Sequence, residues 1–126
     1  MSRFSIKRRK GGFTLIEIMI VVLIIGILLA IAIPNFMRAR DASRGKSCIA
    51  NLKQIDTGKE QYAMDNKLSD GDAGPALAAL CGPGLYIKST PSCPSGGTYT
   101  VDLIGTSPSC DFVDANYPHS LASAGG

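Results

Sequence analysis

The strongest pattern in the chain is an apolar block near its N-terminus that contains a single charged position. All sixteen residues from Ile18 to Ile33 are apolar or glycine, and the segment that starts at Phe13 reaches 21 residues. A helix rises about 1.5 Å per residue, so this segment spans roughly 31 Å, the thickness of a bilayer's hydrocarbon core. The pattern predicts a membrane helix over residues 13–34, in which the lone carboxylate of Glu17 is out of place.

After this block the pattern becomes that of an amphipathic helix. No proline occurs between residues 35 and 67, and apolar residues recur there at helical spacing, namely Cys48, Leu52, Ile55 and Tyr62. Gly45 and Gly58 each weaken a helix by about 1 kcal/mol, which predicts local fraying. We therefore expect a helix over residues 35–67 with one face packed against the rest of the chain.

Two residues interrupt the helical pattern within and just after the apolar block. Pro34 lacks an amide hydrogen and its ring clashes with the preceding turn, so it kinks or ends a regular helix. Gly26 adds backbone freedom. The sequence leaves open whether Pro34 produces a kink or marks the membrane boundary.

The remainder, residues 68–126, predicts loops and a small antiparallel sheet. Proline at position 75 favours the start of a short helix over residues 76–81, and Pro94 to Gly97 is a turn signal. Alternating patterns predict two or three short strands, at residues 85–88, 98–103 and 110–113. The fold class we expect is α+β, with a small sheet lying on a long N-terminal helix.

Charge divides the chain in the same way. The first ten residues hold five basic side chains and no acidic one, at Arg3, Lys7, Arg8, Arg9 and Lys10. Such a cluster keeps its end of a membrane helix in the cytoplasm. Removing residues 1–12 leaves eight basic against 10 acidic residues, a net charge of −2 instead of +3. No basic surface of the kind that binds nucleic acid is left, because Arg38, Arg40, Arg44 and Lys46 lie just past the apolar block, where they fit a solvated helix face near lipid headgroups.

Three interpretations of the N-terminus compete. A secretory signal peptide would be cut after the small-x-small sequence Ala30-Ile31-Ala32, and a plain signal anchor would remain in the membrane. Under either interpretation the rest of the chain is a small disulfide-bonded binding domain, secreted or anchored. Neither explains why Glu17 interrupts the apolar block.

The stretch Gly-Gly-Phe-Thr-Leu-Ile-Glu, which ends at Glu17, resembles the processing site of type IV prepilins and type II secretion pseudopilins. The resemblance implies a leader peptide at residues 1–12, cleavage between Gly12 and Phe13 by prepilin peptidase, and N-methylation of Phe13. Residues 13–34 would then form the membrane and filament-core half of the helix, and residues 35–126 the pilin head. Glu17 becomes the fifth residue of the mature chain.

This interpretation gives Glu17 a role. A lone carboxylate at bilayer depth costs roughly 2.5–3.5 kcal/mol, and a nearby cation offsets much of that cost because Coulomb attraction strengthens in a low dielectric. Cleavage creates such a cation, the ammonium group of Phe13. The resemblance implies that the amine of a neighbouring subunit pairs with Glu17, but residues four apart on a helix also meet, so pairing within the chain remains open.

The function implied by the resemblance is that of a structural subunit. The chain would enter the bacterial inner membrane with its N-terminus in the cytoplasm and its head in the periplasm or outside the cell. Its partners would be the peptidase, which also acts as methyltransferase, membrane lipid before assembly, the inner-membrane assembly machinery, and other copies or pilin-like subunits. The polymer would be a type IV pilus or a type II secretion pseudopilus. No motif of an enzyme occurs.

The resemblance to major pseudopilins extends weakly into the head, through LYIKSTPSCPSGGTYTV. The turn at Cys93 to Gly96 lacks the acid and the tryptophan of those proteins, which puts their calcium site in doubt. Asp102, Asp111 and Asp114 do not have the spacing of a calcium loop. We therefore expect no cofactor.

Four cysteines, at positions 48, 81, 93 and 110, complete the candidate chemistry. The chain has no CxxC motif and a single histidine, His119, so we expect no zinc site and place His119 at the solvated surface. An even number of cysteines outside the cytoplasm favours disulfides. Of three connectivities we favour Cys93–Cys110 with Cys48–Cys81, each bridge contributing about 2–4 kcal/mol.

Overall fold

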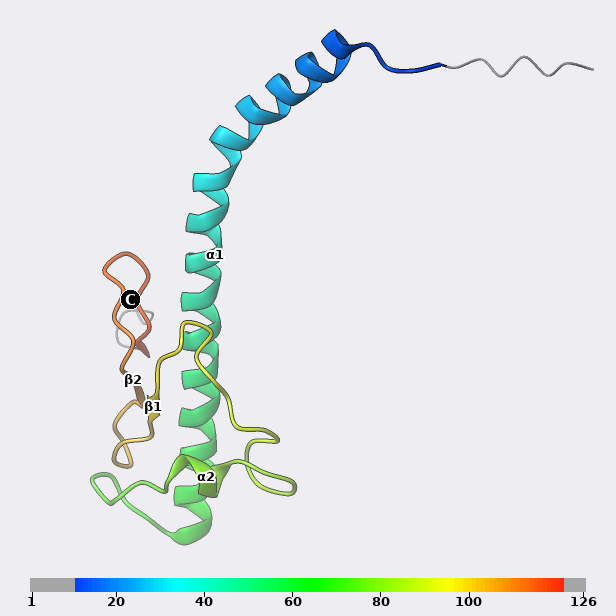
Figure 1. The fold of residues 1–126 in the computed structure, drawn as a ribbon. Helices are drawn as coiled ribbons and strands as arrows, with labels where there is room; N and C mark the ends of the chain where they lie inside the picture. The colour runs from blue at the N-terminus through cyan, green and yellow to red at the C-terminus, as the bar shows by residue number, and fades with distance from the viewer. Residues whose placement is uncertain (1–10, 122–126) are drawn as a thin grey trace, which may run out of the picture. The chain divides into compact units, whose positions relative to one another are not determined.

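The computed structural model describes residues 11–121, so the basic residues of the predicted leader, within residues 1–10, and the terminal residues 122–126 lie outside the described part of the chain. Its elements follow the order α1 (Leu15–Asn66), α2 (Leu77–Leu80), β1 (Tyr99–Thr100) and β2 (Ser109–Cys110) (Figure 1). The chain divides into two compact units, one ending at Met37 and the other beginning at Arg38. We describe each unit by itself and call the second the head.

In the N-terminal unit, α1 begins with a capping box. The Thr14 hydroxyl accepts a hydrogen bond from the Glu17 amide at 3.3 Å, and the Glu17 carboxylate accepts one from the Thr14 amide at 3.3 Å. This reciprocal pair satisfies two amides that the first turn of a helix leaves free. The sequence Thr14-Leu15-Ile16-Glu17 therefore determines that the helix starts at Leu15.

The rest of this unit is an apolar helix whose side chains are all exposed. No residue from 11 to 37 is buried, and the large apolar side chains there are 48–84% exposed. By length and composition, α1 is the one helix in the described residues that could cross a membrane. Its apolar surface covers every side of the helix. Such a helix is typically surrounded by lipid or by other apolar protein surfaces.

Helix α1 continues through both predicted interruptions. It runs unbroken past Gly26 and contains Pro34, so Pro34 does not end the helix. A proline costs about 3 kcal/mol inside a helix, and many turns of uninterrupted helix on both sides outweigh that single cost. The two helical segments that the sequence predicts, residues 13–34 and 35–67, are parts of one element.

In the head, the predicted apolar stripe of α1 is confirmed. Cys48, Leu52 and Ile55 are completely buried, and Tyr62 is half-buried. The chain after α1 folds back alongside this part of the helix (Figure 1) and supplies the other side of the core, with Leu80, Ile87, Cys93, Tyr99 and Val101.

The local fraying predicted at Gly45 and Gly58 from their low helix propensity is not found. Both are buried in a continuous helix. A Cβ atom at Gly58 would lie 3.2 Å from the Ile87 side chain, and one at Gly45 would lie 3.4 Å from the Tyr117 Cβ. Their missing side chains make room for the segments that cover the helix, which offsets their low helix propensity.

The end of α1 agrees with the prediction to within one residue. Lys67 has a φ of 55°, the left-handed conformation, directly after Asn66. The Leu68 amide donates to the Ala63 carbonyl at 2.9 Å and the Lys67 amide to the Met64 carbonyl at 3.4 Å. This pair is a Schellman motif, in which glycine is the usual residue at the position held here by Lys67.

The sheet is smaller than the sequence predicts. Strands β1 and β2 are antiparallel, with Tyr99 opposite Cys110 and Thr100 opposite Ser109. The predicted strand 98–103 is cut short, since Asp102 has a φ of 60°, and the predicted strand 110–113 is found as Ser109–Cys110. Residues 85–88 form no strand, only an isolated bridge between Ile87 and Cys81. The predicted helix at 76–81 is α2.

The segment at 85–88 is fixed to α1 by side chains instead. The Tyr86 hydroxyl donates to the Asp65 carboxylate at 2.7 Å, which raises the pKa of Tyr86. Its ring packs edge-on against the Tyr62 ring, with the centroids 6.0 Å apart. Side-chain contacts with the helix thus take the place of the predicted sheet hydrogen bonds.

Lys59 is a buried cation that holds the loop after β1 on the helix. Its side chain is completely buried, and its Nζ atom donates to the backbone carbonyls of Val101 at 3.2 Å, Leu103 at 3.1 Å and Thr106. Its Nζ atom also lies 3.7 Å from an Asp56 carboxylate oxygen. A buried ammonium is tolerated when its donors are satisfied, and here the loop carbonyls do this.

Candidate functional site

The predicted processing site lies in an open segment just before α1. Gly12 and Phe13 precede the first helical residue and are exposed, Phe13 to 84%. A side chain added at Gly12 would contact nothing within 4 Å. The bond between these two residues is therefore accessible from solvent.

Glu17 has neutral partners in the described chain. Its carboxylate accepts the Thr14 amide, while the ion pairs found among residues 11–121 are Arg44–Asp41 and Lys59–Asp56. No described cation neutralises Glu17. Our sequence analysis overlooked Thr14, although the spacing Thr-x-x-Glu before an apolar run is a known capping signal.

The second site is a cluster in the head that the spacing in the sequence hides. The Sγ atoms of Cys48, Cys93 and Cys110 and a ring nitrogen of His119 all lie within 4.8 Å of one another. The four residues come from α1, from the turn before β1, from the end of β2 and from the segment that follows β2. Cys48, Cys93 and His119 are buried, and Cys110 is half-buried.

The environment of each thiol is different. Burial raises the pKa of Cys48 to about 12, and burial also raises the pKa of Cys110 despite a hydrogen bond from the Phe112 amide. Burial acts to raise the pKa of Cys93 as well, but the amides of Ser95 and Gly97 donate to its sulfur, and its pKa is lowered. Hydrogen bonds that favour the thiolate outweigh desolvation at this one cysteine.

His119 is buried, so its predicted place at the solvated surface is wrong. It is 4% exposed, its Nδ1 atom lies 3.5 Å from the Cys93 sulfur, and its ring lies against the Phe112 ring with the centroids 4.7 Å apart. The turn at Pro118 folds the C-terminal segment back over Gly45 of α1, which has no side chain to block it. Position near the end of the chain was a poor guide to exposure.

Gly97 permits the close packing of the cluster. A Cβ atom there would lie 2.5 Å from the Cys110 sulfur and 2.7 Å from the Phe112 Cβ. Such distances exclude any side chain unless the neighbouring backbone moves. The glycine therefore lets the turn that carries Cys93 approach β2.

The predicted disulfides stay predictions. All four cysteines are free thiols in the structure. Cys93 and Cys110 share the cluster, as a hairpin bridge would require, and Cys48 shares it too. Cys81 is not part of the cluster and packs against the core from the end of α2.

A polar contact fixes the turn before Cys93 to the helix. The Asn51 side-chain amide donates to the Ser92 carbonyl at 3.0 Å and to the Tyr99 hydroxyl at 3.0 Å. Burial raises the pKa of Tyr99. The sequence analysis did not identify Asn51, because a single half-buried asparagine on a helix produces no periodic sequence pattern.

The three head carboxylates considered for calcium do not form a cluster among residues 11–121. Asp102 accepts the Ser109 hydroxyl, Asp111 the Thr98 amide, and Asp114 the amides of Asn116 and Tyr117. Each of these carboxylates is engaged in its own loop, and the expectation that the chain has no cofactor stays a prediction.

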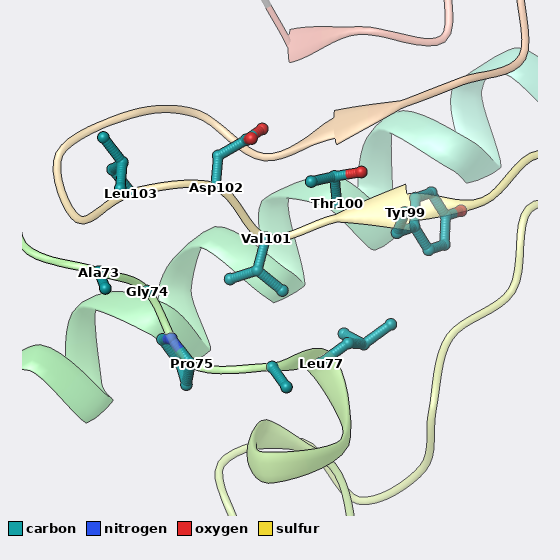
Figure 2. A pocket seen from close by; sticks show the side chains of 10 residues that line it. Ala73, Gly74, Pro75, Leu77, Tyr99, Thr100, Val101, Asp102 and Leu103 are labelled. Atoms are coloured by element: carbon teal, nitrogen blue, oxygen red, sulfur yellow. The ribbon is translucent and has the colours of Figure 1, made fainter.

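An open hollow of about 550 Å³ lies between residues 73–77 and the chain from β1 to Leu103 (Figure 2). Val101 and Leu77 lie between the two segments, and Asp102 points away from Val101. Gly74 makes the close approach of the segments feasible, because a Cβ atom there would lie 2.0 Å from the Asp102 carbonyl oxygen. The lining is mostly apolar, with no histidine or cysteine.

Comparison with known proteins agrees with the N-terminal site. The family model of the prokaryotic N-terminal methylation motif matches residues 7–33. The type II secretion system core protein G of Escherichia coli (strain K12) is 28% identical over 118 residues, which cover 85% of this chain and 81% of that protein. The type IV major pilin protein PilA of Myxococcus xanthus (strain DK1622) is 50% identical over 62 residues, 49% of this chain and 27% of the pilin.

The core protein G of Pseudomonas aeruginosa is 40% identical over 60 residues, 48% of this chain and 42% of that protein. No solved structure matches. The long N-terminal helix and the small antiparallel sheet form an α+β, pilin-like arrangement, and the methylation motif matches the start of that helix. More particularly, the chain is similar to type II secretion system core proteins G along most of its length and to a type IV major pilin over about half of it.

Proposed function

We propose that this chain is cut between Gly12 and Phe13, methylated at Phe13 and then polymerised as a subunit of a type IV pilus or a type II secretion pseudopilus. The observation that carries the proposal is the N-terminal unit: a helix apolar on all sides, with one carboxylate, inside a matched methylation motif. Each large apolar side chain gains about 1.5–3 kcal/mol when it leaves water. Residues 11–37 bury none of theirs within the described chain, so lipid and then neighbouring helices must cover them.

Glu17 determines how the subunits fit. Before cleavage its carboxylate is held in the capping box by neutral donors. Cleavage converts the Phe13 amide nitrogen into an ammonium group, the cation that the described chain lacks. In this proposal a neighbour's Phe13 neutralises the carboxylate where the two groups come level in a stack of subunits, so the pair selects one axial offset.

In this proposal residues 13–34 cross the inner membrane before assembly. The basic leader favours a cytoplasmic N-terminus, and the head then lies in the periplasm or outside the cell. The partners are prepilin peptidase with its methyltransferase activity, membrane lipid, the inner-membrane assembly machinery, and further copies or other pilin-like subunits.

Mass spectrometry of the N-terminus of the chain isolated from its host tests the proposal. We expect N-methylated Phe13. A chain that begins at Ile33 would instead identify a secreted domain, and one that retains Met1 or Ser2 a signal anchor.

A pair of glycine variants adds a control. Gly12→Val should retain the leader, because the peptidase must accommodate the residue before the cut, whereas Gly11→Ala should be processed. Both positions are open in the structure, so neither change disturbs the fold. Normal processing of Gly12→Val contradicts the assigned cleavage site.

A further inference from the structure

We propose that Cys48, Cys93, Cys110 and His119 form a structural zinc site in the head. The inference is independent of polymerisation, because it concerns only residues after Arg38. Nothing in the methylation motif or in the apolar helix requires it.

The first support is convergence. Zinc in a structural site takes four ligands in a tetrahedron, with Zn–S of about 2.3 Å and Zn–N of about 2.0–2.1 Å, and Cys3His is a common ligand set. These bond lengths separate the ligand atoms by roughly 3.5–3.8 Å. The four ligand atoms here already lie within 4.8 Å of one another, so they reach such a tetrahedron by contracting about 1 Å.

The second support is the hydrogen bonding around the sulfurs. The amides of Ser95 and Gly97 donate to Cys93, and the amide of Phe112 donates to Cys110. At both cysteines the amide two residues further on is a donor. Polar partners around the ligand atoms are a regular part of metal sites. The turn itself is closed by the Gly96 amide on the Cys93 carbonyl at 3.0 Å.

The composition of the cluster favours a metal over a disulfide. A bridge between any two of its three cysteines leaves the third thiol and His119 without a bonding role. The fourth cysteine of the chain, Cys81, is not in the group. One zinc ion would use all four side chains. Thiolate ligands suit zinc, whereas calcium and magnesium prefer oxygen ligands.

The position of the cluster shows what zinc would do. Its ligands come from α1, the turn before β1, the end of β2 and the C-terminal segment, which are the pieces that a sheet of two two-residue strands cannot hold together alone. All four zinc positions would be filled by protein, so the site is structural and not catalytic.

The test uses the full chain, solubilised from membranes in detergent without chelators or reducing agents. We expect one equivalent of zinc by elemental mass spectrometry and four titratable thiols after unfolding with a chelator. Cys93→Ser and His119→Ala should lose the zinc. Cys81→Ser, the matched control, should keep one equivalent and show three thiols.

Several results overturn the proposal. Absence of zinc together with two or no titratable thiols would show disulfides instead of a metal site. One equivalent of iron or copper in place of zinc would show the wrong metal. Zinc retained by both Cys93→Ser and His119→Ala would show that these residues are not its ligands. If the variants fail to fold, exchange of the native chain with cobalt(II) decides instead: intense visible absorption of tetrahedral cobalt–thiolate supports the site, and its absence refutes it. The N-terminal mass is measured separately, so failure of this site leaves the pilin assignment standing.

Discussion

The two units of this chain are stabilised in opposite ways. The N-terminal unit, residues 11–37, buries no side chain of its own and makes no described ion pair. The head has a small core around the helix, a buried lysine and a cluster of soft ligands. The first unit therefore leaves its apolar surface uncovered within the described chain, whereas the head is stabilised by its own core and polar groups, and mutations should show that difference.

The largest effect should come from Glu17→Gln. Glutamine at this position still fits the capping box, so the helix and its insertion into the membrane should persist while the charge is lost. Removing one partner of a buried ion pair costs about 3–5 kcal/mol, repeated at every subunit contact. We expect filaments sheared from cells to fall to background, with the head folded normally. Normal filament yield with an unchanged axial rise would falsify the pairing of subunits through Glu17.

Lys59→Met tests the opposite principle in the head. Methionine fills a similar volume but leaves three loop carbonyls without their donor, which should destabilise the head by about 2–4 kcal/mol. Thermal unfolding followed by the tyrosine circular dichroism signal measures this. Asp56→Asn is the control: its carboxylate is partly exposed, so the loss should be about 1 kcal/mol or less. Equal losses for the two variants would mean that the carbonyl contacts do not matter.

Gly74→Ala should destabilise the head next most. The new Cβ would meet the Asp102 carbonyl (Figure 2), and overpacking of this kind costs about 1–3 kcal/mol. Gly71→Asn is the comparison: that position is open, so it adds only the backbone strain of a φ of 93°, which asparagine tolerates better than most side chains. Denaturant midpoints of the two variants should differ. Coinciding midpoints would show that the loop shifts freely.

The smallest predicted effect is an increase in the stability of the head. Lys67 holds the left-handed position after α1, so Lys67→Gly should stabilise the head by about 0.5–1 kcal/mol. Lys67→Ala keeps the strain and should give no such gain. A higher midpoint for both variants would indicate that the lysine charge, and not its backbone, is the unfavourable feature.

The elements that depend on local patterns were the predictable ones. The apolar block, the stripe from Cys48 to Ile55 and the end of α1 near Asn66 follow from periodicity and end signals, which act over a few residues. The predicted strands were too long, because residues 85–88 and 101–103 are held by side chains of α1 such as Asp65 and Lys59 and not by partner strands. Strand propensity depends on such surroundings.

The sequence by itself determined the N-terminal unit, because a helix that is apolar on all sides and a methylation motif are local features that need no partner within the chain. Only the tertiary structure decided the head: it buried Lys59 and His119, turned Gly45 and Gly58 into contact points, and gathered three cysteines from distant segments. The spacing of residues along the chain carries no information about such long-range contacts, since they depend on how the loops fold back on the helix.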